Sequence, residues 1–145
     1  MLDLNNLQHY RESNRLEAKE ALGGLPESIW ETYSAFANAD GGVILLGVKE
    51  LPDRSLEALD LLDPEWLIED FWKIVKDPVL VNRNILTAED IHVHEVAGKH
   101  IIAITVPKSE AIVYIGQDPY RGTYRRRGDG DYRCSREEVA AMLGK

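Results

Sequence analysis

The chain has 145 residues, of which 44% are apolar and 29% are charged, and its formal net charge is -8. This length fits one globular domain with a substantial hydrophobic core. No apolar run approaches the length of a membrane span and no secretory signal begins the sequence, so we expect no contact with a membrane. The single cysteine, Cys134, rules out an intramolecular disulfide and favours a cytoplasmic location.

Residues 11–21 (RESNRLEAKEA) combine charges of both signs with few apolar side chains. Two interpretations of this segment remain open. It is either a solvated surface or the source of Glu12, Glu17 and Lys19 for a functional site. Which interpretation holds depends on what the rest of the chain places beside it.

A helix is predicted within residues 25–42 (LPESIWETYSAFANADGG). Pro26 fits its first turn, and apolar side chains recur at helical spacing at Ile29, Trp30, Tyr33, Phe36 and Ala37. We interpret the Gly41-Gly42 turn as the end of this helix rather than as a ligand site. The continuous apolar run of residues 43–48 (VILLGV) then predicts a buried strand.

A second helix is predicted between Asp63 and Asp77. Asp63 is a typical N-cap followed by a proline, and one face of the helix is formed by Trp66, Leu67, Phe71 and Ile74. Residues 91–96 and 100–106 are apolar or alternating runs separated by a short Ala-Gly turn. They predict a β-hairpin.

Residues 111–115 predict another strand, which we expect to pair with residues 123–127 across a loop. A capping box from Ser135 to Glu138 predicts a short last helix. This order of elements predicts an α+β fold, with a mixed β-sheet and flanking helices. We expect residues 1–145 to form a single domain that is the N-terminal part of a longer protein.

Several common sites are missing from the sequence. It contains no G-x-x-x-x-G-K-[ST] loop, no G-x-G-x-x-G motif after a strand and no Cys/His set at zinc spacing. His92 and His94 would share a face of their strand, and we interpret them as solvated histidines rather than as metal ligands. Cys134 has no histidine near it in the sequence, so we interpret it as a small packing residue rather than a nucleophile.

Residues 119–136 hold six arginines and two aspartates, a local charge of +4 in a chain whose other residues carry -12. Alternation along a strand would put Tyr124 and Arg126 on one face, and Arg125 and Arg127 on the other. Guanidinium groups bind phosphates and aromatic rings stack on bases, so this segment predicts binding of single-stranded nucleic acid. The alternative is an edge strand that its charges protect from aggregation.

Three motifs together resemble the Schlafen-type AlbA-like domain, which occurs in bacterial RecG-related helicases and transcriptional regulators. They are E-x-x-x-x-E-x-K from Glu12, the segment SAFANADGGVILLGVKE at residues 34–50, and YRRRGDGDYRCS at residues 124–135. They span almost the whole chain in the family's order. The resemblance implies an α+β module that binds DNA or RNA, and the residues to which we assign this contact are Arg121, Tyr124, Arg125, Arg126, Arg127 and Arg133.

In the nuclease members of the Schlafen family, three carboxylates form a metal-dependent site that cleaves RNA. The resemblance places these carboxylates at Glu12, Glu17 and Glu50, with Lys19 taking charge from the phosphate, so Mg²⁺ or Mn²⁺ would be the cofactor. This chain differs from those nucleases, which have aspartate at the third position, an acid in place of Lys49, and two copies of the unit.

The leading hypothesis is therefore a nucleic-acid-binding module of a bacterial regulator or helicase-related protein, without a cofactor. The alternative is a metal-dependent endonuclease, and a second alternative is an oligomerisation domain that binds no nucleic acid. Arginines that face solvent on one surface would favour binding. Arginines that pair with acids across a two-fold axis would favour a homo-oligomer.

Overall fold

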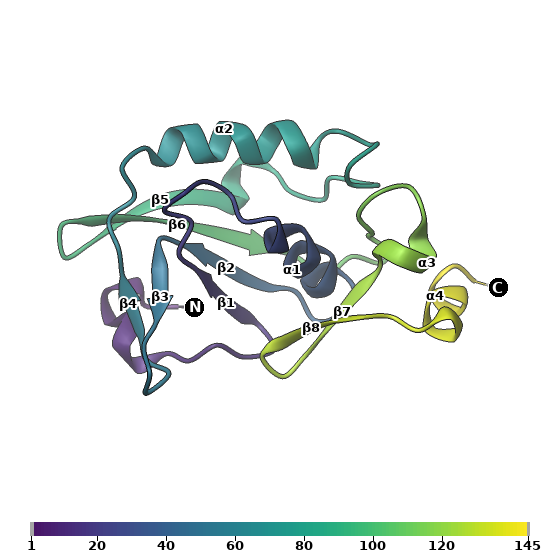
Figure 1. The fold of residues 1–145 in the computed structure, drawn as a ribbon, viewed down its shortest axis with the longest axis horizontal. Coiled ribbons are helices and arrows are strands. Elements are labelled where there is room, and N and C mark those ends of the chain that lie inside the picture. The colour runs from purple at the N-terminus through teal and green to yellow at the C-terminus, as the bar shows by residue number, and fades with distance from the viewer. Residues whose placement is uncertain (1, 145) are drawn as a thin grey trace.

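A four-stranded mixed sheet forms the centre of the fold, in the order β1–β2–β6–β5 (Figure 1). The computed structural model describes residues 2–144. Strand β1 is parallel to β2, and the other pairs are antiparallel. The strands are β1 (Leu16–Lys19), β2 (Gly42–Leu46), β5 (Ile91–Val96) and β6 (Lys99–Val106). The predicted α+β class, the buried strand after the first helix and the β5–β6 hairpin are confirmed.

Two helices cover one face of this sheet, namely α1 (Ser28–Ala37) and α2 (Pro64–Val75). Their apolar side chains pack on β2, β5 and β6 in one core cluster, and the Trp30 and Phe71 rings stack with centroids 4.9 Å apart. Asp63 caps α2 as predicted, because its side chain accepts the Trp66 N–H at 3.1 Å.

The predicted inner face of α2 is correct except at Trp66, which is 54% exposed. The buried residues Leu67, Phe71 and Val75 recur every four positions. Trp66 precedes this stripe by one residue, which rotates it about 100° away from the sheet.

The opposite face of the sheet is covered by a 3-10 helix and a small hairpin. These are η1 (Leu4–His9), β3 (Val48–Glu50) and β4 (Leu56–Ala58), and they share a second core cluster with β2 and β6. Strand β2 is therefore buried on both faces. This burial explains why its sequence is a continuous apolar run rather than an alternating one.

One strand pairing was predicted wrongly. Residues 111–115 form no strand and touch the expected partner only through an isolated bridge between Tyr114 and Thr123. Instead, β7 (Tyr124–Arg127) pairs with β8 (Gly130–Arg133) across a two-residue turn. A short helix, α3 (Pro119–Gly122), lies between residues 111–115 and β7 and limits their contact to that bridge. The two-residue turn between β7 and β8 also costs less entropy to close than the longer loop of the predicted pairing would.

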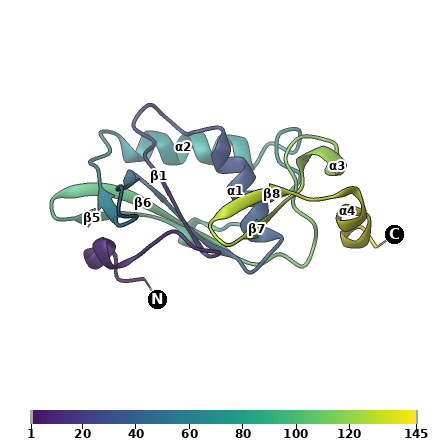
Figure 2. The same ribbon diagram turned by 60° about the horizontal axis from the view of Figure 1, so that its bottom comes forward.

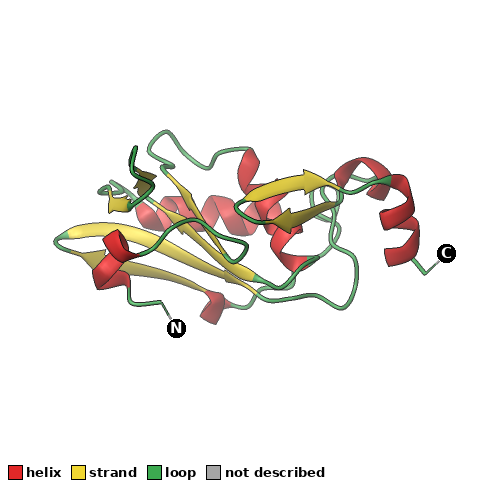
Figure 3. Ribbon diagram, turned by 90° about the horizontal axis from the view of Figure 1, so that it is seen from below, coloured by secondary structure: helices red, strands yellow, loops and turns green. Residues whose placement is uncertain are grey.

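The β7–β8 hairpin runs from near the middle of the molecule toward the end where the last helix, α4 (Arg136–Met142), lies (Figure 3). The predicted capping box begins α4: Ser135 Oγ accepts the Glu138 N–H at 3.1 Å, and the Glu138 carboxylate accepts the Ser135 N–H at 2.8 Å.

None of the helices within residues 2–144 combines the length and the apolar character that a membrane crossing requires.

Candidate functional site

The inner face of the β7–β8 hairpin is anchored by Arg126, whose side chain is only 1% exposed. All five of its guanidinium N–H groups have acceptors. Nη1 donates to Glu17 and to Asp131, each at 2.8 Å, and the remaining groups donate to the carbonyl oxygens of Ser13 and Leu16. Arg126 is thus fully engaged within its own chain.

The charge of Arg126 is retained despite its burial. Burial by itself would lower the pKa of Arg126, but hydrogen bonds to Asp131 and Glu17 raise it above its ordinary value. The guanidinium also lies over the Phe36 ring, 4.9 Å from its centroid. The sequence-based assignment of Arg126 to phosphate contacts does not match this placement, because it has no donor left for a phosphate.

Ser34 of α1 and Asn38, the C-cap of that helix, hold the hairpin strand in place. Asn38 Nδ2 donates to the carbonyl oxygens of Val113 and Tyr124, at 2.7 and 2.9 Å, and Asn38 Oδ1 accepts the Val113 N–H at 2.9 Å. Ser34 Oγ accepts the Tyr124 N–H at 3.0 Å. The polar positions of the SAFAN segment therefore fix β7 against α1 and do not face solvent.

The Gly41-Gly42 turn also has a packing explanation, as the sequence predicted. Gly41 has a φ of +76°, and a Cβ there would lie 2.8 Å from the Val106 carbonyl oxygen. A Cβ on Gly42 would lie 2.9 Å from both the Arg15 carbonyl oxygen and the Phe36 ring. Only glycine lets these backbones approach so closely.

The outer face of the hairpin presents two arginines beside a tyrosine. Arg125 and Arg127 alternate with the buried Tyr124 and Arg126, as predicted, and both are exposed. Tyr132 of β8 lies directly opposite Arg125 and is 53% exposed. Arg127 Nη2 also donates to Glu138 at 3.1 Å, an ion pair that is exposed to solvent.

Tyr124, which the sequence assigned to nucleic acid, lies instead on the inner face and is 7% exposed. Its hydroxyl accepts a hydrogen bond from exposed Arg133 at 3.3 Å. The solvent-facing aromatic residue of the hairpin is Tyr132. The pairing of β7 with β8 could have identified it, because that register puts Tyr132 on the face of Arg125.

Two further arginines extend this surface toward α3 and α4. The side chain of Arg121 is 87% exposed and lies 3.7 Å from Asp118. Arg136, which the sequence-based assignment omitted, lies over the Tyr120 ring at 4.6 Å from its centroid. Arg133 is also exposed, but it lies opposite Tyr124 and so borders this surface from the other face of the hairpin. The surface formed by Arg121, Arg125, Arg127, Tyr132 and Arg136, together with the bordering Arg133, is called the arginine surface below.

The four residues of the predicted nuclease site do come together. Glu12, Glu17, Lys19 and Glu50 line one open pocket of about 460 Å³ beside β1, called the carboxylate pocket below. Lys19 Nζ donates to Ser28 Oγ at 2.9 Å and lies 3.9 Å from Glu17 Oε2. Residues 16–19 form the expected extended segment next to β2, with Glu17 and Lys19 on one side of it.

Glu12 has an unusual environment in this pocket. Burial, a hydrogen bond with Glu17 and the charges of Glu17 and Glu50 raise the pKa of Glu12 to about 8. Opposing this rise, Glu12 Oε2 accepts the Ala18 N–H at 2.9 Å, on the free edge of β1. Glu12 therefore keeps its proton to a higher pH than an ordinary glutamate, and it satisfies a backbone donor that no strand pairs.

The pocket as it stands does not fit a divalent metal ion. Within residues 2–144, no three His, Cys, Asp or Glu side chains are grouped so that they could hold one. The charge of Glu17 is already balanced by Arg126 at 2.8 Å and by Lys19 at 3.9 Å. These features match a structural network better than a metal site.

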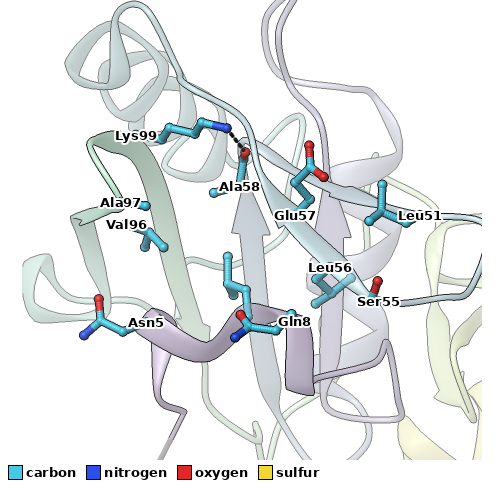
Figure 4. A pocket seen from close by; sticks show the side chains of 11 residues that line it. Asn5, Gln8, Leu51, Ser55, Leu56, Glu57, Ala58, Val96, Ala97 and Lys99 are labelled. Carbon is cyan, nitrogen blue, oxygen red and sulfur yellow. Dashed lines mark hydrogen bonds between the residues drawn. The ribbon is translucent and has the colours of Figure 1, made fainter.

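Two other features lie elsewhere. One is a pocket of about 290 Å³ that is lined by residues of η1 and of the β3–β4 hairpin. Lys99 also lines it and donates a hydrogen bond to the Ala58 carbonyl oxygen (Figure 4). His92 and His94 share one side of β5, as predicted, with ring centroids 6.1 Å apart. Neither feature contacts the arginine surface.

Comparisons with known proteins give a family match and structural neighbours. The family model described as Schlafen, AlbA_2 matches residues 12–135. The N-terminal domain of a RecG-related protein from Nitrosomonas europaea is 30% identical, with a TM-score of 0.64 and 90% coverage of each chain. The DIP2311 protein from Corynebacterium diphtheriae is 21% identical, with a TM-score of 0.58; the match covers 88% of this chain and 26% of that one. No curated protein matches the sequence.

Proposed function

Because the chain belongs to the Schlafen AlbA_2 family, we propose that it is a nucleic-acid-binding module of a larger cytoplasmic protein related to regulators or RecG-type helicases. The arginine surface carries the proposal. On it, Arg125 and Arg127 flank the exposed ring of Tyr132, while the inner face of the same hairpin is fixed to α1.

The chemistry of this surface fits a phosphate backbone with unpaired bases. The guanidinium group of arginine donates paired hydrogen bonds to phosphate oxygens, and a base can stack on an exposed tyrosine ring. The positive charge is concentrated on one hairpin in a chain of net charge -8. This concentration would attract an anionic polymer locally, although the whole chain is acidic. Either DNA or RNA could satisfy these contacts.

The proposal predicts weak, salt-dependent binding of a 12-nucleotide single strand. If about four arginines each neutralise one phosphate, the slope of log K against log salt is about -3. The Arg125→Ala/Arg127→Ala/Arg133→Ala variant should lose most of the affinity in fluorescence anisotropy, because all three side chains are exposed. Arg126 stays intact in this variant, so the hairpin remains anchored.

The matched control is Lys49→Ala/Lys73→Ala, which removes exposed cations away from the hairpin. It should bind nearly as the wild type does. Equal affinity of the wild type and the triple variant at 50 mM salt would refute the proposal. In the oligomerisation alternative, the wild type would bind no oligonucleotide and sediment as a dimer or larger species.

A metal-dependent nuclease is the second candidate, because Glu12, Glu17, Glu50 and Lys19 line one pocket. We expect Mn²⁺ or Mg²⁺ to leave the melting temperature unchanged, since Arg126 and Lys19 already balance Glu17. A metal bound at a hundredfold excess over its Kd would instead stabilise the fold by about 2.7 kcal/mol. A metal-dependent rise, together with RNA cleavage that Glu17→Gln abolishes, would make the protein an enzyme.

A further inference from the structure

A second cationic site lies beside the segment that anchors the hairpin. An open pocket of about 540 Å³ is formed by residues 10–16, the Gly41-Gly42 turn and the end of β6. Ser13 and Leu16 line this pocket, and their carbonyl oxygens are also the acceptors of Arg126. The pocket and the hairpin therefore share one wall.

The charged side chains of this pocket are mostly basic. Arg11, Arg15 and Lys108 line it together with a single acid, Asp40. Within residues 2–144, none of these three cations has a carboxylate within 4.0 Å. What distinguishes this group is that three such cations line one pocket in a chain that has 25 acidic and 17 basic residues.

Two of the cations are free to meet a ligand. Arg15 and Lys108 are exposed, and the side chain of neither makes a hydrogen bond with any residue of 2–144. Arg11 is partly committed, because its Nη1 donates to the carbonyl oxygens of Gln8 and Tyr10 at 3.1 and 3.0 Å. The charge of Arg11 also lowers the pKa of Asp53 to a minor extent, after the hydrogen bonds from Ser55.

The remaining lining includes the apolar residues Leu16, Val43, Val106 and Pro107. Apolar surface beside a bound anion lowers the local dielectric constant and strengthens the attraction of the anion to neighbouring cations. A phosphate group matches this arrangement, because lysine and arginine side chains are its usual partners in nucleic-acid complexes. The turn beside the pocket leaves no room for side chains, since a Cβ on Gly41 or Gly42 would lie within 2.9 Å of neighbouring atoms.

We propose that this pocket binds a backbone phosphate of the same nucleic acid that the arginine surface holds, with Arg15 and Lys108 as its main contacts. The inference rests on the proposed function. It extends the contact surface for the nucleic acid from the hairpin across residues 13–16. It also gives a role to Arg15 and Lys108, to which neither the three sequence motifs nor the hairpin assigned one.

The test uses the Arg15→Gln/Lys108→Gln variant with a labelled 12-nucleotide strand between 50 and 200 mM salt. Loss of one neutralised phosphate should reduce the magnitude of the salt slope by about 0.7. The control Lys49→Gln/Lys73→Gln removes the same charge elsewhere and should keep the wild-type slope. In ¹H–¹⁵N spectra of the wild type, the oligonucleotide should shift the amide signals of Gly41, Gly42 and Lys108.

The outcomes separate the two proposals. If the wild type binds no oligonucleotide, both the proposed function and the second site are wrong. If the wild type binds and the hairpin variant does not, but Arg15→Gln/Lys108→Gln keeps the slope of its control, only the second site is refuted. A reduced slope together with shifted Gly41 and Gly42 signals supports the second site.

Discussion

At the residue scale, Arg126 and Arg127 are neighbours in the sequence, yet their side chains are 1% and 66% exposed. Arg127 makes one solvent-exposed ion pair, of a kind that adds at most about 1 kcal/mol to stability. Arg126 instead joins β7 to β1 through two carboxylates and two carbonyl oxygens. Arg127 is therefore available for a ligand, and Arg126 holds in place the hairpin that carries Arg127.

Replacing Arg126 by methionine should therefore destabilise the fold strongly. The substitution removes the 2.8 Å partner of Glu17 and Asp131, whose side chains are both only 15% exposed, and leaves Lys19 at 3.9 Å as the one cation near Glu17 within residues 2–144. Removing one partner of a buried ion pair costs about 3–5 kcal/mol. Urea unfolding would measure this loss, with Arg127→Met as the control, for which we expect less than about 1 kcal/mol. Similar losses for the two variants would contradict the anchoring role of Arg126.

Glu12 illustrates how one carboxyl group can respond to its neighbours. It lies near Glu17 and Glu50, and its pKa is raised from 4.5 to about 8, chiefly by burial. Between these two values the folded protein binds a proton that the unfolded chain has released. The contribution of Glu12 to stability is therefore present below pH 4.5 and is lost as the pH rises toward 8.

Glu12→Gln should remove this pH dependence, because an amide mimics the protonated carboxyl and can still accept the Ala18 N–H. We expect the variant to match the wild type near pH 5 and to exceed its stability at pH 8.5. Glu12 is half-buried, so screening by solvent limits the gain to about 1–2 kcal/mol.

Chemical denaturation at pH 5, 6.5 and 8.5 would measure this difference. Exposed Glu20 lines the same pocket, so Glu20→Gln is the control and should follow the wild type. Parallel pH profiles for wild type and Glu12→Gln would show that Glu12 is ionised like an ordinary glutamate.

At the element scale, helix α1 is the support on which the hairpin rests. Its apolar residues pack on the sheet and on α2, while Thr32, Ser34 and Asn38 face the hairpin and the segment before it. Thr32 Oγ1 donates to Asp131 at 2.6 Å, so α1 also reaches the ion pair of Arg126. The helix thereby fixes the hairpin to the core. A two-stranded hairpin by itself would be only marginally stable.

Asn38→Ala should weaken this support. It removes the Asn38 partner of the Tyr124 carbonyl oxygen and of the Val113 N–H, whereas the Val113 carbonyl oxygen keeps the hydrogen bond from Ser34 Oγ at 2.8 Å. Each unsatisfied buried group costs about 1–3 kcal/mol, and we expect a total loss of about 2–4 kcal/mol because water can reach part of the site. Hydrogen exchange of the β7 amides should accelerate more than that of the β6 amides.

The control for this substitution is Asn84→Ala, because the side chain of Asn84 accepts only the nearby Leu86 N–H. It should leave the exchange of β7 unchanged. If Asn38→Ala slowed or preserved the exchange of β7, the hairpin would not depend on α1 in the way described.

At the scale of the whole molecule, the charged surfaces are arranged around the short β1 strand. The β7–β8 hairpin and α4, which carry most residues of the arginine surface, lie toward the C-terminal end of the molecule, and η1 and the β3–β4 hairpin lie toward the other end (Figure 2). The carboxylate pocket and the second cationic pocket both use residues between 10 and 20. The mixed charges of the first motif thus supply a structural ion pair, a protonated acid and free cations.

The sequence by itself determined the α+β class, both long helices, the doubly buried β2, the β5–β6 hairpin and the capping box of α4. Each depends on the period of apolar residues or on contacts within a few positions, which a linear sequence records directly. It also predicted that Glu17 and Lys19 share one side of an extended segment beside β2. The prediction that Glu12 and Glu17 lie near Glu50 came from the family resemblance.

Only the tertiary structure decided which arginines are available. Arg126 meets Glu17 across 109 positions of sequence, and Tyr132 faces outward because β7 pairs with β8 rather than with residues 111–115. Strand alternation divides residues into two faces, but it does not say which face meets the core. That choice follows from how the hairpin packs on α1 and beside β1. There Arg126 lies over the Phe36 ring and finds acceptors for all its N–H groups in two carboxylates and in the carbonyl oxygens of residues 13 and 16.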